Sequence, residues 1–168
     1  MKIIVFILAT LLSPTLWAAD DCTFDPDYQV KVLTAVAQSE PGASLDLERR
    51  EVSWNAVGTD STVFGYGGCD DLGSTVSCTT PMKAPRTQEQ VFALAKDLAE
   101  RFWSNKHVAA SLATEALLFG LSAQRFEIER LNGTTIYSVR DSHYVELYVE
   151  HSYMDGVDSV IIAWQGNF

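Results

Sequence analysis

Residues 64–73 read FGYGGCDDLG, and this stretch connects two predicted β-strands. It contains four glycines, one cysteine and two adjacent carboxylates. Glycine permits backbone conformations and close approaches that other residues resist. We therefore interpret the stretch as a shaped turn between neighbouring strands. Asp70 and Asp71 form its negatively charged tip, and Cys69 is placed to anchor it.

The pattern on both sides of this turn predicts a meander of three strands. Apolar and polar residues alternate from Leu45 to Ala56, as expected for a half-buried strand. A second strand covers residues 62–66, and β-branched residues predict a third over 74–80. Pro81 follows the third strand and ends it, because proline has no backbone N–H to donate to a neighbouring strand.

Three helices are predicted, one before this meander and two after it. The first covers residues 27–39. Thr87 and Gln90 form a capping-box pattern at the start of the second. Its apolar residues recur at helical spacing: Val91, Leu94, Ala95, Leu98 and Phe102. The third is expected to end at Gly120 and to bury Val108, Leu112, Ala116 and Phe119.

The last part of the chain predicts a second meander. Asn132-Gly133 is a strong signal for a two-residue hairpin between strands at 126–131 and 134–139. Alternation predicts a strand at 144–150 that points Val145, Leu147 and Val149 inward and Tyr144, Glu146, Tyr148 and Glu150 outward. A loop at 152–158 leads to an apolar strand at 160–164. The predicted fold is α+β: an antiparallel sheet of about seven strands in two meanders, with an N-terminal helix and a central helical pair.

The first 19 residues have the features of a secretory signal peptide. Lys2 precedes an apolar run over residues 3–12, and small residues follow at Ala18 and Ala19. The run is too short for a membrane span, which needs about 20 residues. We therefore expect residues 20–168 to form a single exported domain in the periplasm.

The cysteines fit an oxidising compartment, where two of the three should form a disulfide. Pairing of Cys69 with Cys78 would close a short loop. We favour Cys22 with Cys69, because a longer closed loop constrains the unfolded chain more. Cys78 would then be buried as a small apolar residue. A metal site is not expected, since the spacings are unsuitable and no histidine lies near the cysteines.

No pattern in the chain indicates catalysis, and neither a cofactor nor a metal is predicted. The sequence has no Gly-x-Ser-x-Gly elbow and no Ser-x-x-Lys motif. Its clustered glutamates lie at outward strand positions, whereas a carboxylate hydrolase needs one acid in an apolar pocket. The formal charge of −10 disfavours nucleic acid and favours a basic protein partner.

Two groups of residues are candidates for binding such a partner. Tyrosine offers contact area at low entropic cost, and glutamate complements a basic surface. One group is the outward row Tyr144, Glu146 and Tyr148. The other consists of acidic loop tips: Asp70, Asp71, Tyr153, Met154 and Asp155.

The signal peptide, the Cys22 start, the motif at 66–73 (YGGCDDLG) and the helix end at 100–103 (ERFW) give the sequence a family resemblance. It resembles periplasmic immunity proteins that neutralise type VI secretion effectors attacking peptidoglycan, amidases among them. It is similar, more loosely, to periplasmic lysozyme inhibitors, whose barrel lacks a long helical pair. The resemblance implies a non-enzymatic protein that occludes the active-site cleft of a cell-wall-degrading enzyme. A secreted carboxylate-dependent hydrolase and a structural module of the envelope are the alternatives.

Overall fold

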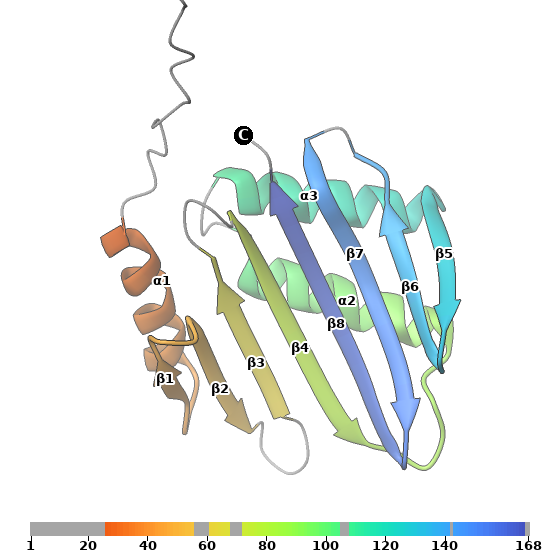
Figure 1. Cartoon of the computed structure of the whole chain (residues 1–168), viewed down its shortest axis with the longest axis horizontal. Coiled ribbons are helices and arrows are strands. Elements are labelled where there is room, and N and C mark those ends of the chain that lie inside the picture. The colour runs from red at the N-terminus through yellow and green to blue at the C-terminus, as the bar shows by residue number, and fades with distance from the viewer. Residues whose placement is uncertain (1–25, 56–60, 68–71, 105–107, 142, 167–168) are drawn as a thin grey trace, which may run out of the picture.

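The computed structural model describes residues 26–55, 61–67, 72–104, 108–141 and 143–166. Over these residues the chain forms three helices and one eight-stranded antiparallel sheet. The strand order across the sheet is β1-β2-β3-β4-β8-β7-β6-β5 (Figure 1). The predicted α+β class, the N-terminal helix and the central helical pair are confirmed.

The first meander contains four strands, one more than the sequence predicted. They are β1 Ser44–Asp46, β2 Glu51–Asn55, β3 Ser61–Tyr66 and β4 Gly73–Pro81. The predicted strand starting at Leu45 is in fact a hairpin of β1 and β2. The carboxylate of Asp46 accepts hydrogen bonds from the N–H groups of Glu48 and Arg49, both at 3.0 Å. This side-chain turn reverses the chain after three residues of strand.

The second meander joins the first through its last strand. Its strands are β5 Phe126–Leu131, β6 Thr134–Val139, β7 Tyr144–Met154 and β8 Val157–Gly166. β8 pairs with β4 along its length, from Val157 opposite Pro81 to Gln165 opposite Gly73. The predicted hairpin at Asn132-Gly133 is confirmed, with φ angles of 50° and 84°. The two meanders therefore make one continuous sheet.

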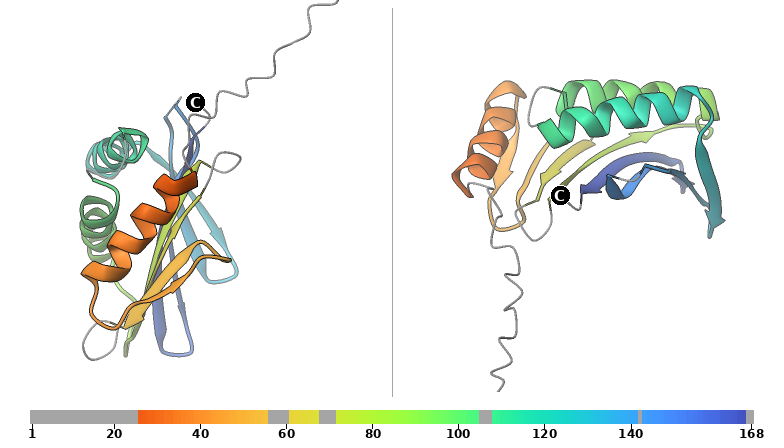
Figure 2. Two further views of the ribbon diagram at one scale, coloured as in Figure 1. Left: turned by 90° about the vertical axis from the view of Figure 1, so that its left-hand side faces the viewer. Right: turned by 90° about the horizontal axis from the view of Figure 1, so that it is seen from above.

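The helices α1 Pro26–Ser39, α2 Gln88–Phe102 and α3 Val108–Ser122 lie on the same side of this sheet (Figure 2). The capping box at the start of α2 is confirmed: Thr87 and Gln90 exchange hydrogen bonds of 2.9 and 3.3 Å. The apolar stripe of α2 is buried at Val91, Ala95, Leu98 and Phe102. These side chains form the centre of the core against the inward residues of the sheet.

The predicted inner face of α3 is only partly correct: Ala116 packs against the core, and the side chain of Val108 lies outside the described part of the chain. Leu112 and Phe119 were expected in the core, yet they are 46% and 58% exposed. The buried positions of α3 carry mainly small side chains: Ala110, Ala113, Thr114, Leu117, Gly120 and Leu121. Gly120 lies inside the helix rather than capping it, and a Cβ there would come within 2.5 Å of Val139. Close approach to α2 and β6 selects this small-residue face.

The opposite face of the sheet is covered by none of the described helices (Figure 2). Its central strands present mostly small and hydroxyl-bearing residues, at Thr75 and Ser77 on β4 and at Ser159 and Ala163 on β8. An antiparallel sheet can leave one face to solvent in this way. No described helix is long and apolar enough to cross a membrane.

Candidate functional site: an acidic cleft on the uncovered face of the sheet

A β-bulge in β7 decides which side chains reach the uncovered face. Tyr144 lies opposite Gly166 of β8, whereas Glu146 lies opposite Gln165, so β7 contains one extra residue between these pairs. The bulge reverses the alternation before Glu146. Tyr144 consequently turns to the helix side, where its ring lies 6.0 Å from that of Trp164.

The predicted outward row is therefore corrected at its first member. Glu146, Tyr148 and Glu150 share the uncovered face, and Tyr144 does not. Val145, expected in the core, is 62% exposed. The prediction was correct for Leu147 and Val149, which follow the bulge and are buried. The bulge breaks the strict alternation on which the prediction rests, and the sequence does not mark it.

A cleft lies next to this bulge, between β6 and β7. Pairing between these strands extends only to Ser138 opposite Tyr148, and β7 continues beyond this point against β8 alone. The separated ends enclose about 730 Å³. We call this space the acidic cleft, after the charged side chains that line it: Glu129, Arg140, Asp141, Glu146 and Glu150.

The charge of the acidic cleft is strongly negative, with four carboxylates and one guanidinium. The guanidinium of Arg140 already donates to the carboxylate of Glu127 on β5. The phenol of Tyr148 is half-buried, which raises its pKa, and the carboxylates of Glu146 and Glu150 raise it further. The hydroxyl of Tyr148 thus lies in a negative field, and it stays protonated as a hydrogen-bond donor.

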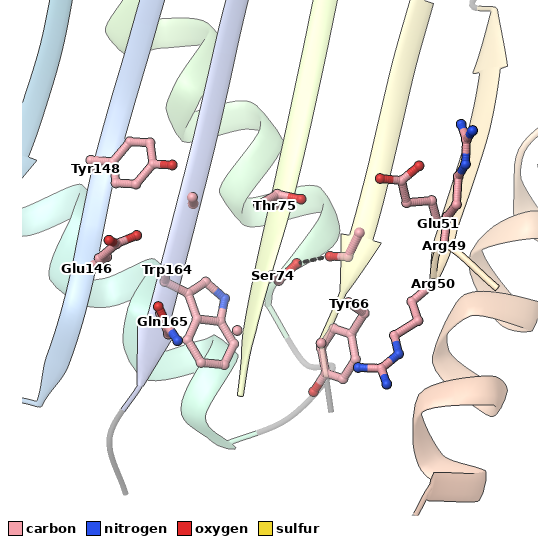
Figure 3. A pocket seen from close by; sticks show the side chains of 14 residues that line it. Arg49, Arg50, Glu51, Tyr66, Ser74, Thr75, Glu146, Tyr148, Trp164 and Gln165 are labelled. Carbon is pink, nitrogen blue, oxygen red and sulfur yellow. Dashed lines mark hydrogen bonds between the residues drawn. The ribbon is translucent and has the colours of Figure 1, made fainter. Parts of the chain in front are cut away.

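A second hollow of about 290 Å³ lies on the other side of β7 (Figure 3). Its floor is made of small residues at Gly65, Thr75 and Ala163. A Cβ on Gly65 would come within 2.7 Å of the Thr75 hydroxyl, so a larger residue at this position would clash with the floor of the hollow. Glu146 and Tyr148 line both spaces, whereas Glu150 lines the acidic cleft alone. We call these three residues on the uncovered face of β7 the ridge. Arg49, Arg50 and Glu51 form the far rim of the second hollow.

Sequence reasoning missed a buried charged cluster at the opposite end of β7 and β8. Asp158 is fully buried, and its carboxylate accepts hydrogen bonds of 2.9 Å from the backbone N–H of Arg86 and from His151 Nε2. The Arg86 guanidinium pairs with the same carboxylate and donates to Thr80 Oγ1 at 3.1 Å. We call Asp158, Arg86, His151 and Thr80 the Asp158 cluster.

Electrostatics indicate a structural role for the Asp158 cluster. Burial acts to raise the pKa of Asp158, but the hydrogen bonds from Arg86 and His151 and the charge of Arg86 outweigh it and lower the pKa. The cluster joins β8 to the segment that precedes α2. A signal was available: Asp158 has the same strand parity as Val160, Ile162 and Trp164, so an inward carboxylate could have been expected.

The predicted loop at 152–158 is also wrong. β7 and β8 are joined by a two-residue turn at Asp155-Gly156, with φ angles of 54° and 79°. Met154 is 61% exposed and Asp155 is exposed, but Tyr153 is half-buried and donates to the carbonyl of Met82 at 3.1 Å. This turn lies at the far end of β7 from Glu146, so Tyr153, Met154 and Asp155 do not form one site with Glu146 and Tyr148.

The remaining predicted residues fall largely outside the described part of the chain. Asp70, Asp71 and both cysteines of the favoured disulfide, Cys22 and Cys69, lie there. Cys78 is buried on β4, as expected. Within the described ranges, no three His, Cys, Asp or Glu side chains are grouped closely enough to hold a metal ion. Comparison with known protein families, with curated protein sequences and with solved structures finds no match to this chain.

Proposed function

We propose that this chain is an exported binding protein that inhibits a cell-wall-degrading enzyme by covering its active-site cleft. The observation that carries the proposal is the ridge of Glu146, Tyr148 and Glu150 on a sheet face that none of the described helices covers. The ridge offers an aromatic contact between two carboxylates. Such a surface suits the basic rim or the cationic catalytic groups of a peptidoglycan amidase.

The geometry favours binding over catalysis by these carboxylates. A general acid of a hydrolase works from an apolar, enclosed environment that holds its proton. Glu146 is exposed and Glu150 is half-buried at the edge of an open cleft. Tyr148, by contrast, combines a half-buried ring with a protonated hydroxyl, which is the pattern of an interface anchor.

The test measures inhibition of purified peptidoglycan amidases and glycosidases acting on isolated peptidoglycan. We expect the protein to form a complex with one of them and to inhibit it stoichiometrically. The double variant Glu146→Gln, Glu150→Gln should weaken inhibition by about tenfold or more, because two charges near the centre of the contact are removed. A matched variant, Glu48→Gln with Glu100→Gln, changes two exposed glutamates elsewhere and should inhibit normally.

Two results would contradict the proposal. The first is the absence of complex and inhibition with every enzyme of the panel. The second is degradation of peptidoglycan by the protein itself, abolished in the Glu146→Gln, Glu150→Gln variant. That outcome would support the carboxylate-dependent hydrolase instead.

A further inference from the structure

The outward face of α3 carries two large apolar side chains that remain exposed, Leu112 and Phe119. Leu112 and Phe119 are 46% and 58% exposed, and they lie on one helix stripe with Ala116 between them. The stripe borders a space of about 330 Å³ that Tyr144 closes from the start of β7. We call this space the α3 groove. A helix of this kind normally directs its large apolar residues into the core.

Small side chains on the inner face of α3 explain why the large ones remain outside. The helix packs on α2, β6 and β7. Leu117 and Leu121 already occupy part of the buried face, its other positions are small, and the approach at Gly120 leaves no room for a Cβ. Rotating Leu112 or Phe119 inward would force this interface apart. The apolar stripe is thus a fixed property of the fold.

Charge at the α3 groove is negative around Tyr144. Glu115 and Asp141 both line the groove. Burial raises the pKa of Tyr144 to about 12, with further contributions from the charges of Asp141 and Glu115. His143, which is exposed, lies on the rim. An apolar wall therefore stands beside two carboxylates that face the same space.

The charge at the Phe119 end of the stripe is positive, in contrast to the negative charge around Tyr144. The guanidinium of Arg125 lies over the Phe119 ring, 5.2 Å from its centroid. This cation stands near the ring, whereas the two carboxylates stand near Tyr144. A bound ligand would therefore direct its own cation toward Tyr144 and its apolar part toward Leu112 and Phe119.

We propose that the α3 groove is a docking site for a protein segment that presents a large apolar side chain next to a lysine or arginine. The apolar side chain packs between Leu112 and Phe119, and the cation lies beside Glu115 and Asp141. The aliphatic part of a lysine or arginine also suits a partly apolar wall.

A second copy of this chain is a poorer occupant on electrostatic grounds. The chain has a formal charge of −10, and the groove itself holds two carboxylates. Self-association through this face would bring like charges together. The groove contains none of Glu146, Tyr148 and Glu150, although it shares Asp141 and Tyr144 with the acidic cleft.

The experiment follows the backbone amides of the ¹⁵N-labelled protein by NMR during titration with acetyl-Phe-Lys-Phe-Lys-amide. The same peptide with glutamate in place of lysine is the charge control. We expect the lysine peptide to shift the amides around Leu112, Ala116 and Phe119, and the glutamate peptide to leave them unchanged. Added salt should weaken the effect, because part of the attraction is electrostatic.

Two double variants test the two halves of the groove. The apolar variant combines Leu112→Ser with Phe119→Ser and should weaken peptide binding by about tenfold or more. The charge variant combines Glu115→Gln with Asp141→Asn and should also weaken it. Both exchanged apolar residues are half exposed or nearly so, so the fold should survive. Leu47→Ser with Leu131→Ser is the matched control, since these leucines are 51% and 59% exposed elsewhere.

Several outcomes would overturn the docking site. They are equal binding of the glutamate peptide, unchanged binding to the Leu112→Ser, Phe119→Ser variant, and the absence of any shift. Shifts confined to Glu146 and Glu150 would assign the peptide to the acidic cleft instead. A dimer detected by sedimentation and lost in the Leu112→Ser, Phe119→Ser variant would identify a second copy as the occupant. The Glu146→Gln, Glu150→Gln variant, which tests the proposed inhibition, should bind the peptide normally.

Discussion

The β7–β8 hairpin carries negative charge in two different environments, one buried and paired and the other at an open cleft. Close to the turn, the carboxylate of Asp158 is fully buried and is bound by Arg86 and His151. Between the middle of β7 and its other end, Glu146 and Glu150 flank Tyr148 on the uncovered face. Among the described residues, neither of these glutamates forms an ion pair.

This difference in burial and ion pairing distinguishes a cluster that stabilises the fold from a surface that can bind a partner. A charge inside the protein is tolerated only when partners compensate for its lost hydration, so the Asp158 cluster is complete within the fold. Charges at an open cleft remain hydrated, and water makes their mutual repulsion modest. The glutamates of the acidic cleft can therefore stay unpaired until a cationic partner binds, whereas Asp158 cannot.

The largest expected effect comes from removing the buried carboxylate. Asp158→Ala leaves the Arg86 guanidinium, only 15% exposed, without its counter-charge. We expect the free energy of unfolding in urea to fall by about 3 kcal/mol, the usual cost of breaking a buried ion pair from one side. The segment before α2 should also lose hydrogen-exchange protection, because the Arg86 N–H bond to Asp158 is removed.

An exposed pair provides the control for this measurement. Glu127 accepts a hydrogen bond from Arg140, and both side chains are more than half exposed. Glu127→Ala should cost less than about 1 kcal/mol, because water screens such pairs. An equal fall in the free energy of unfolding in Asp158→Ala and Glu127→Ala would show that burial does not decide how much each ion pair contributes.

The next effect is a dependence of stability on pH. Because the folded pKa of Asp158 is lowered, the unfolded chain binds its proton more readily than the native one. The stabilisation is fully present above the unfolded pKa, about 4 for an aspartate, and is lost as the pH falls through the lower folded pKa. Arg86 and His151 face this carboxylate, and Arg86 keeps its charge throughout.

The measurement compares Asp158→Asn with the unchanged protein by urea unfolding between pH 6 and pH 2.5. The difference in unfolding free energy should be constant at the upper end and shrink below about pH 4. A difference that grows below about pH 4 would mean that the folded pKa of Asp158 is raised rather than lowered.

Much of the fold could be predicted from local signals. The capping box at Thr87 and the Asn132-Gly133 turn each specify their structure within four residues, so no tertiary information was needed. Asp155-Gly156 carries the same hairpin signal as Asn132-Gly133. It was assigned to a longer loop, although the alternation of β7 continues up to it.

The errors occurred where packing decides between local alternatives. Hydrophobicity favoured Leu112 and Phe119 for the inner face of α3, but close packing selected the alanines and Gly120. The bulge before Glu146 depends on pairing with β8, and nothing in residues 144–150 marks it. The Asp158 cluster unites residues 72 positions apart, and only the folded sheet brings Arg86 to Asp158.

The smallest expected effect concerns the unpaired glutamates of the acidic cleft. In Glu146→Gln with Glu150→Gln, repulsion between two like charges on one strand face is removed without loss of an ion pair. The unfolding free energy should therefore stay constant or rise by up to about 0.5 kcal/mol at low salt, and the gain should vanish at high salt. Titration of Tyr148 by ultraviolet absorbance should move to lower pH, because both carboxylates raise its pKa in the unchanged protein. A clear loss of stability would mean that these glutamates support the fold in the same way as Asp158. The acidic cleft would then be a structural cluster, and its glutamates would not differ from Asp158 in their role.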